Sequence, residues 1–275
     1  MTSNGVKYFD AHTHANFAAY GEDRDAVIER ARDASVAMNV VGTQFDTSRS
    51  AVELAKKYDD VYATIGLHPI HTAKSYHDEK EIGEGGKEFT SRGEIFDKER
   101  YRSLAKNEKV IAIGECGLDY YRIDESTKEV QMRAFIEQIE LAGEIKKPLM
   151  LHIRNAYADA LEVLRAHAGV RGDVHFFAGD WEVAKKFLEL GFTLSFTGVI
   201  TFARDYDEVI RNTPLDMLLS ETDAPYVTPV PYRGKRNEPS YVPLIVQKIA
   251  EIRGEDTERV AAALMENARR VFGIV

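Results

Sequence analysis

The stretch FDAHTHANF, residues 9–17, gives the first indication of the fold. It is a short apolar segment typical of a β-strand, and it carries His12 and His14 with one residue between them. In a strand, residues i and i+2 point to the same side. Two imidazoles on one side of a strand end can act as a pair of metal ligands. Such a pair also occurs by chance or packs as a polar part of a core, so the rest of the chain must decide between these interpretations.

Seven further apolar, β-rich runs follow and alternate with helical patterns along the whole chain. This alternation is typical of a parallel α/β fold, and eight strands in a chain of 275 residues predict a TIM-type (β/α)8 barrel. We expect a single domain over residues 1–275. The predicted strands are 8–12, 39–45, 61–68, 110–116, 148–153, 173–179, 192–198 and 217–223.

Helical periodicity predicts a helix after most of these strands and two helices after the last one. The connection 69–97 is different, because it is polar, contains glycines and has no clean periodicity. Loops of this length are commonly lids, binding loops or insertions, so we expect a lid or insertion loop there. The predicted helices are 22–37, 47–58, 126–145, 156–168, 181–190, 204–212, 240–253 and 256–272.

The composition narrows the class of protein. A net charge of −9 argues against a broad basic surface for nucleic acid, although bound divalent cations can make one cleft attractive to phosphate. No apolar run approaches the roughly 18 residues that span a bilayer, and the polar start lacks a signal-peptide pattern. The single cysteine, Cys116, is compatible with a reducing compartment. We expect a cytoplasmic protein without a membrane segment, and the sequence indicates no stable protein partner.

Side chains that bind metals recur at the ends of other predicted strands, which is the face where barrel active sites are built. Four imidazoles and two carboxylates are more than one tetrahedral zinc needs, but they suit two cations that share a carboxylate. We expect Glu115 to be the shared ligand, with His12, His14 and Asp223 on one cation and the other two histidines on the second. The six candidate ligands are His12, His14, Glu115, His152, His175 and Asp223.

The sequence resembles the TatD family of metal-dependent hydrolases, which belongs to the amidohydrolase-like barrels. The motifs that carry the resemblance lie in order between residues 9 and 239: FDAHTH, IGLHP, AIGECGLDYY, LHIRNA, VHFFAG, LSETDAPY and YRGKRNEP. The resemblance implies a TIM-type barrel with divalent metal ions and phosphodiesterase activity, typically as a 3′-to-5′ exonuclease on DNA or RNA. It also implies ligand roles for the same six residues. The identity of the metals stays open among Mg, Mn and Zn.

Other residues near the strand ends are candidates for catalysis or substrate binding. His68 ends the third predicted strand and could contact a phosphate or assist proton transfer, while Asp223 would orient a water molecule and accept its proton. Glu221 lies one layer deeper than Asp223 and is expected to support a ligand rather than to be one. Tyr120, like its neighbour Tyr121, could stack on a terminal base. The basic side chains that could hold a phosphate backbone are Arg154, Arg233, Lys235 and Arg236.

Three functions are compatible with these residues. A metal-activated water could cleave a phosphodiester, and single-stranded DNA, or else RNA, is the expected substrate. The same site could cleave a carbonyl compound, which makes a D-aminoacyl-tRNA deacylase the second interpretation. A non-catalytic barrel that binds nucleic acid or protein is the third, and the presence of all six candidate ligands argues against it. The basic YRGKR loop favours a phosphate-bearing substrate.

Overall fold

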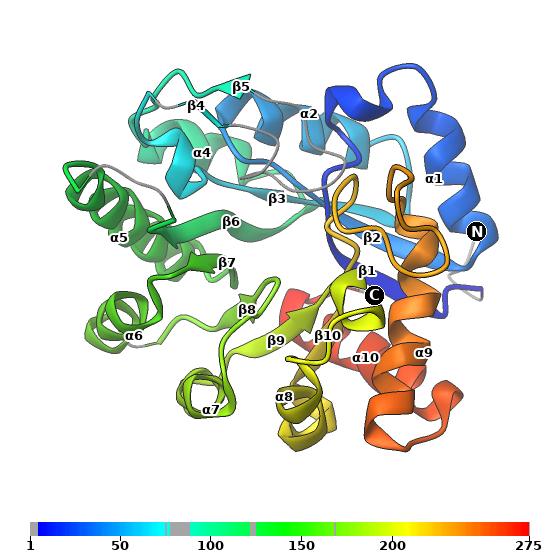
Figure 1. Ribbon diagram of the computed structural model, residues 1–275. Coiled ribbons are helices and arrows are strands. Elements are labelled where there is room, and N and C mark those ends of the chain that lie inside the picture. Colours follow the sequence, from blue (N-terminus) through cyan, green and yellow to red (C-terminus); the bar gives the residue numbers. More distant parts are fainter. Residues whose placement is uncertain (1–4, 75, 78–88, 122–124, 168, 275) are drawn as a thin grey trace.

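The computed structural model describes residues 5–74, 76–77, 89–121, 125–167 and 169–274. Eight parallel strands form one sheet, in which neighbouring strands follow the order of the chain with only the short β4 and β5 left out, and helices lie around the outside of it (Figure 1). This confirms the predicted TIM-type barrel. The strands are β1 (Tyr8–Thr13), β2 (Val36–Val41), β3 (Val61–Ile65), β6 (Val110–Asp119), β7 (Leu149–Arg154), β8 (Gly172–Val174), β9 (Thr193–Phe196) and β10 (Leu218–Ser220).

The first and last strands meet where they end, which closes the barrel. Thr13 forms a parallel bridge with Ala224, and the amide of His14 donates to the carbonyl oxygen of Ala224 at 2.8 Å. The amide of Asp223 donates to the carbonyl oxygen of His12 at 2.9 Å. The closure therefore places the candidate ligands of β1 beside Asp223.

The helices cover the outer face of the sheet (Figure 1). They are α1 (Arg24–Asp33), α2 (Phe45–Ala55), α4 (Lys98–Leu104), α5 (Thr127–Ile145), α6 (Tyr157–Ala166), α7 (Trp181–Glu189), α8 (Asp207–Asn212), α9 (Val242–Arg253) and α10 (Thr257–Phe272). Short 3-10 helices are η1 (Ala18–Tyr20), η2 (Pro69–His71), η3 (Gly198–Thr201), η4 (Leu215–Met217) and η5 (Pro239–Tyr241). None of the helices in the described part of the chain combines the length and the apolar character that crossing a membrane requires.

Several predicted boundaries differ from those of the structure, and the largest shift in a helix end is that of α1, which was predicted to run to residue 37. Helix α1 ends at Asp33 and the second strand begins at Val36, because Ser35 adopts a left-handed conformation with φ of 61° and so stops the helix. Helix α4 was not predicted, since it has only seven residues and a charged sequence. Its start is fixed by Asp97, whose carboxylate accepts a hydrogen bond from the amide of Arg100 at 3.1 Å.

The long connection 69–97 lies partly outside the described residues. Its described part contains η2 and a short antiparallel ladder of β4 (Tyr76–His77) with β5 (Phe89–Thr90). Glu94 ties the end of this connection to the barrel, because its carboxylate accepts hydrogen bonds from the amide of Phe45 at 3.2 Å and from the hydroxyl of Tyr101 at 2.9 Å. A lid function for the connection stays a prediction.

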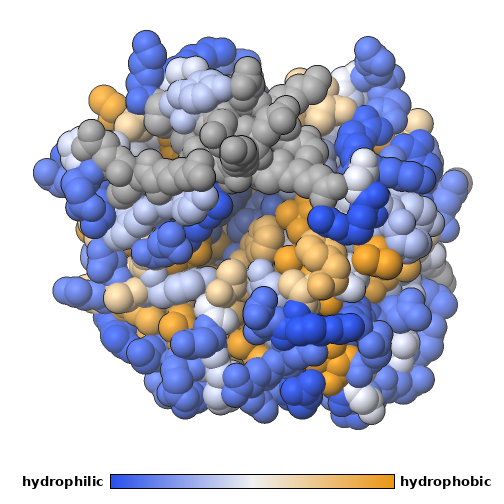
Figure 2. Space-filling model, in the orientation of Figure 1, coloured by the Kyte–Doolittle hydropathy of each residue, from blue (hydrophilic) through white to orange (hydrophobic). Residues whose placement is uncertain are grey.

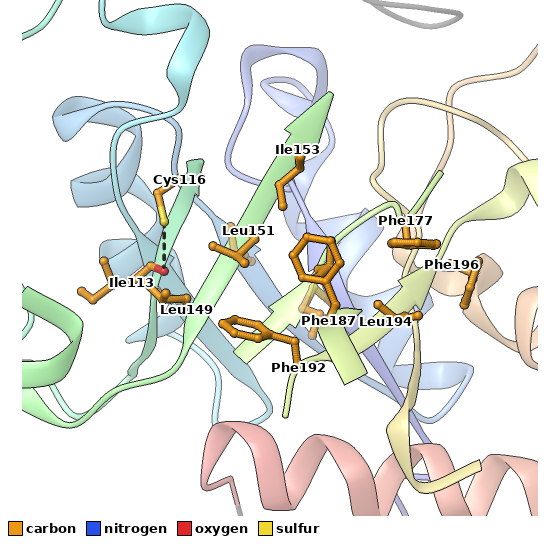
Figure 3. Packing of buried hydrophobic residues seen from close by; sticks show 14 of the residues in the cluster. Ile113, Cys116, Leu149, Leu151, Ile153, Phe177, Phe187, Phe192, Leu194 and Phe196 are labelled. Atoms are coloured by element: carbon orange, nitrogen blue, oxygen red, sulfur yellow. Dashed lines mark hydrogen bonds between the residues drawn. The ribbon is translucent and has the colours of Figure 1, made fainter. Parts of the chain in front are cut away.

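Two apolar clusters hold the barrel together. The larger one fills the space between the sheet and the helices, and Figure 3 shows Cys116 in it, with its sulfur directed to the carbonyl oxygen of Ile113. The smaller one seals the beginnings of the strands, where Phe272 of α10 packs at 5.9 Å, ring centre to ring centre, from Phe9. Several of its members are the second residue of a strand: Phe9, Ala37, Ile111, Met150 and Leu219.

Candidate metal centre

The structure brings all six candidate ligands together at the ends of the strands. His12 lies in β1, Glu115 in β6 and His152 in β7, whereas His175 and Asp223 come just after β8 and β10. The remaining candidate, His14, directly follows β1, and its Nε2 lies 3.3 Å from Nε2 of His12. All are buried except His152, which is half-buried. The convergence depends on the parallel arrangement, since the six residues are far apart in sequence.

The carboxylate of Glu115 separates the histidines into two groups. Its Oε2 lies 3.5 Å from Nε2 of His12 and 3.8 Å from Nε2 of His14. Its Oε1 lies 2.9 Å from Nδ1 of His152 and 3.3 Å from Nε2 of His175. A carboxylate whose two oxygens face different sets of nitrogen atoms has the arrangement that a shared ligand of two cations requires.

Two glycines explain why Glu115 can occupy this place. A Cβ atom at Gly114 would lie 2.3 Å from the carbonyl oxygen of Met150, and one at Gly117 would lie 2.1 Å from that of His152. Both residues also have positive φ, 151° and 142°. The Gly-Glu-Cys-Gly sequence thus lets β6 approach β7 closely on both sides of Glu115.

Asp223 lies on the side of the first group of histidines. Its Oδ1 is 3.5 Å from Nε2 of His14 and 3.8 Å from Nε2 of His12. Burial, and then the negative charges of Glu115 and Glu221, raise the pKa of its carboxyl to about 8. A bound cation would oppose this shift, because it favours the ionised carboxylate.

The hydrogen bonds of two histidines fix which ring nitrogen can bind a cation. Nδ1 of His14 lies 2.9 Å from the carbonyl oxygen of Val41, and this oxygen can only accept, so Nδ1 carries the hydrogen. Nδ1 of His175 lies 3.0 Å from the carboxylate of Glu221 and donates in the same way. In the neutral rings, Nε2 is therefore the atom whose lone pair points into the cluster, as binding of a divalent cation needs. Although burial lowers the pKa of His175, the charges of Glu221 and Glu115 raise it well above its usual value, so a cation would displace a proton from this ring.

Burial keeps the first pair of histidines neutral. It lowers the pKa of His12 to about 3 and that of His14 to about 4. For Glu115, burial alone would raise the pKa, but the surrounding imidazoles, His68 first, hold it well below its usual value. For His12, His14 and Glu115, these are the protonation states that metal binding requires.

Sequence reasoning missed Asp119, which supports His152. The carboxylate Oδ2 of Asp119 lies 3.0 Å from Nε2 of His152. Burial lowers the pKa of His152, but hydrogen bonds to Asp119 and Glu115 outweigh it and raise the pKa to about 9. The alternation of side chains along a strand could have revealed Asp119, because it is four residues after Glu115 and so faces the same side of the strand. The predicted strand stopped at Cys116, whereas β6 continues to Asp119.

Glu221 contacts His175 from the interior of the barrel. Its Oε1 accepts hydrogen bonds from Nδ1 of His175 and, at 2.7 Å, from the amide of Phe176. Its Oε2 lies 2.7 Å from the hydroxyl of Ser195. Glu221 is fully buried, so these bonds fix both the tautomer and the orientation of the His175 ring.

His68 presents a hydrogen to the cluster. Its Nδ1 accepts a hydrogen bond from the amide of Ile70 at 3.2 Å, so the neutral ring carries its hydrogen on Nε2. Nε2 lies 3.4 Å from Oε1 of Glu115. Burial is the main reason why the pKa of His68 is lowered, and the ring can act as a neutral donor.

The residues expected to bind substrate have defined partners. The guanidinium of Arg154 lies 3.8 Å from the ring centre of Tyr121, and the hydroxyl of Tyr120 donates to Asp159 at 2.9 Å. Nζ of Lys235 lies 5.6 Å from the ring centre of Tyr232. The guanidinium of Arg233 lies 3.8 Å from the ring centre of Phe202.

Arg236 differs from the other basic residues of its loop. It forms two hydrogen bonds with the carboxylate of Asp23, at 2.9 and 2.6 Å, and lies over the ring of Tyr20 at 4.6 Å. Its guanidinium therefore joins the loop after β10 to the start of α1.

A parallel barrel with buried clusters of His and Glu at the strand ends defines a metal-dependent hydrolase of the amidohydrolase type. Residues 9–273 match the family model described as TatD related DNase, and the chain belongs to the TatD family. It is 40% identical over 271 residues to the uncharacterized metal-dependent hydrolase YabD of Bacillus subtilis, covering 97% of this chain and 99% of that protein.

Two further proteins extend the comparison. The 3′-5′ ssDNA/RNA exonuclease TatD of Pectobacterium parmentieri is 35% identical over 275 residues, covering 96% of this chain and 98% of that protein. The crystal structure of YJJV, a TatD homolog from Escherichia coli K12, superposes with a TM-score of 0.84 and 28% identity, covering 98% of this chain and 99% of that chain. The family and the barrel are thus shared over nearly the whole chain.

Proposed function

We propose that this protein is a phosphodiesterase that removes nucleotides from the 3′ end of single-stranded nucleic acid, with DNA as the first candidate substrate and RNA as the second. The observation that carries the proposal is the position of Glu115, whose two carboxylate oxygens face separate groups of histidines. The name of the Pectobacterium relative supports the choice of substrate and direction.

The cluster would hold two divalent cations. One would be bound by His12, His14, Glu115 and Asp223, and the other by Glu115, His152 and His175. When bound, such cations lower the pKa of a water molecule and stabilise the charge that develops on the phosphate.

Protein groups would complete the reaction. Asp223 is the carboxylate near the rim, and it would orient the attacking water and accept its proton. His68 carries a hydrogen on Nε2 and would donate it toward the leaving oxygen or a phosphate oxygen. The side chains proposed to contact the substrate are Arg154, Arg233, Lys235 and Tyr120.

The test is hydrolysis of single-stranded DNA labelled at its 5′ end, with Mg²⁺, Mn²⁺ or Zn²⁺ added. We expect products that shorten stepwise from the 3′ end, and no products in EDTA. Asp223→Asn should lose at least about 100-fold in rate, because a positioned acid–base group contributes this much or more. Asp216→Asn is the matched control, since Asp216 is exposed in η4 and should leave the rate unchanged.

Other results would redirect the assignment. Hydrolysis of aminoacyl-tRNA but not of DNA would move the reaction to a carbonyl centre on the same site. A wild-type rate for Asp223→Asn would contradict its role as the proton acceptor. A purified protein that binds no metal and cleaves nothing would support a barrel that only binds its partner.

A further inference from the structure

Phe202 is an exposed aromatic side chain on the face of the barrel that holds the metal centre. It is the residue after η3, the short helix that follows β9, and 42% of it is exposed. Among the phenylalanines whose exposure the structure describes, a set that leaves out Phe89, it alone is in the exposed class. Figure 2 shows a hollow near the middle of this view, with apolar side chains gathered along one side of it. A ring that is left in water at the rim of a site needs an explanation.

The ring is held against a cation from another loop. The guanidinium of Arg233, in the loop after β10, lies 3.8 Å from the ring centre of Phe202. Arg233 also donates from Nη1 to the carbonyl oxygen of Thr228 at 3.4 Å. The stack therefore combines an aromatic plane from the β9 loop with a positive charge from the loop that follows Asp223.

Close packing of these two loops makes the stack rigid. The amide of Val230 donates to the hydroxyl of Thr201 at 3.0 Å. A Cβ atom at Gly198 would lie 2.4 Å from the carbonyl oxygen of Val227, so the two backbones touch. Val230 is itself 45% exposed and adds apolar surface beside Phe202. A preformed surface of this kind loses little entropy when a ligand binds.

The chemistry of the patch fits a nucleotide. The chain carries a net charge of −9, and Arg233 supplies a positive charge in the loop after β10 that can pair with phosphate. Lys235 adds a second cation in the same loop, over the ring of Tyr232. Aromatic rings interleaved with cations are how proteins bind single strands, because every base can stack on a ring and every phosphate can pair with a cation.

We propose that Phe202 and Arg233 form a subsite for single-stranded nucleic acid, in which Phe202 stacks on a base remote from the cleaved bond and Arg233 pairs with a neighbouring phosphate. The inference rests on the proposed function for its choice of ligand. It adds Phe202 to the side chains proposed to contact the substrate and gives Arg233 a defined neighbour, and the stacking contact would favour a strand of several nucleotides over a small diester.

The first experiment measures binding of a fluorescent single-stranded DNA of about ten nucleotides by anisotropy, in EDTA so that no cleavage occurs. Phe202→Ala should raise the Kd about tenfold or more, because removing one stacking ring has an effect of this size. Phe202→Trp should retain wild-type affinity, since a larger ring stacks equally well. An unchanged Kd for Phe202→Ala would overturn the proposal.

A matched pair of arginines tests the phosphate contact. Arg100 lies 3.7 Å over the ring of Phe45, so Arg100→Gln removes an arginine–phenylalanine stack elsewhere in the molecule. Arg233→Gln should reduce the salt dependence of log K by about 0.7, the value for one contact with a single strand, whereas Arg100→Gln should leave it unchanged. An equal reduction in both variants, or none in either, would contradict the role of Arg233.

Abasic oligonucleotides separate stacking from a structural effect. Wild type should lose affinity when one particular base is removed, and Phe202→Ala should be insensitive to removal of that base. The same sensitivity in both proteins would overturn the subsite. Hydrolysis of bis(p-nitrophenyl) phosphate, a single diester with no neighbouring nucleotide, should be equal in the two proteins.

The two proposals can fail separately. If the wild type binds the strand in a Phe202-dependent way but cleaves neither DNA nor RNA, the subsite stands and the exonuclease assignment falls. If it cleaves DNA with equal KM in wild type and Phe202→Ala, the exonuclease stands and the subsite falls.

Discussion

The two ends of the same strands carry opposite chemistry. At their beginnings, β1 supplies Phe9 and β7 supplies Met150 to an apolar layer that α10 seals. Near their ends, the same two strands supply His12 and His152 to the buried polar cluster. A few residues of strand thus separate a region that only packs from a region that holds charge.

The difference shows that one end of the barrel provides stability and the other end provides the candidate metal site. The apolar end gains stability from buried surface and needs no particular chemistry. The polar end buries ionisable groups, which costs free energy unless they are paired or bind cations. Substitutions at the two ends should therefore separate stability from metal binding.

The largest effect is expected at Glu115. Glu115→Gln keeps the shape of the side chain but removes the negative charge that both groups of histidines face. We expect the rate of DNA hydrolysis to fall on the order of 10³-fold and the metal content to drop, and the midpoint of thermal unfolding to fall with the loss of the bound cations. Elemental analysis and calorimetry would measure this. Full metal content with a normal rate would remove Glu115 from the shared position.

At the other end, Phe9→Ala should have the opposite profile. Phe9 is 3% exposed and packs on Phe272, so its truncation should lower the free energy of unfolding by about 3–5 kcal/mol. Urea unfolding measures the loss, and isothermal titration should show little change in metal affinity. Phe202→Ala is the matched control, with a loss under about 0.5 kcal/mol. A parallel loss of metal affinity in Phe9→Ala would show that the two ends are coupled.

The effect on metal binding expected at Asp119 lies between those at Glu115 and Phe9, because Asp119 contacts a candidate ligand without being one of the six. Asp119→Asn removes the charge that orients His152, and we expect metal affinity to fall about 10- to 100-fold. The affinity is measured by titrating the metal-free protein. Tyr120→Phe, in the next residue, should leave it unchanged, and an equal effect in the two variants would indicate a general disturbance of this strand end.

The smallest effect is expected at the loop rim, where Arg236 pairs with Asp23. The hydrogen bond from Arg236 lowers the pKa of Asp23, so the pair adds stability above the unfolded-state pKa of about 3.9 and loses it as pH falls through the lower folded-state value. Since Asp23 is partly exposed, Arg236→Met should destabilise by only about 0.5 kcal/mol at pH 7.

The measurement is urea unfolding of Arg236→Met and wild type at pH 7 and at pH 3. The difference between the two proteins should shrink at pH 3. Arg49→Met removes an exposed pair with Asp46 and should have no measurable effect at either pH. A difference that grows at low pH would mean that Arg236 acts through another contact.

The sequence predicted the barrel and the meeting of six side chains because both follow from local patterns. Strand alternation fixes that His12 and His14 share a side, and parallel order fixes which strand ends meet. Asp119 escaped because the length of β6 depends on its pairing with β7, which the local sequence does not report. The stack of Phe202 and Arg233 escaped because it depends on contact between two loops.

The seam between Thr13 and Ala224 sets the order of events during synthesis. His12 and His14 emerge from the ribosome early, but their neighbours across the seam are translated more than two hundred positions later, as shown by a separation of 211 residues between Thr13 and Ala224. A nascent chain consequently lacks Asp223, one of the four proposed ligands of the first cation, until 223 of its 275 residues have been made. If the proposed cations bind, they would bind best once Asp223 has joined the other ligands, and the binding would favour molecules whose ends have met.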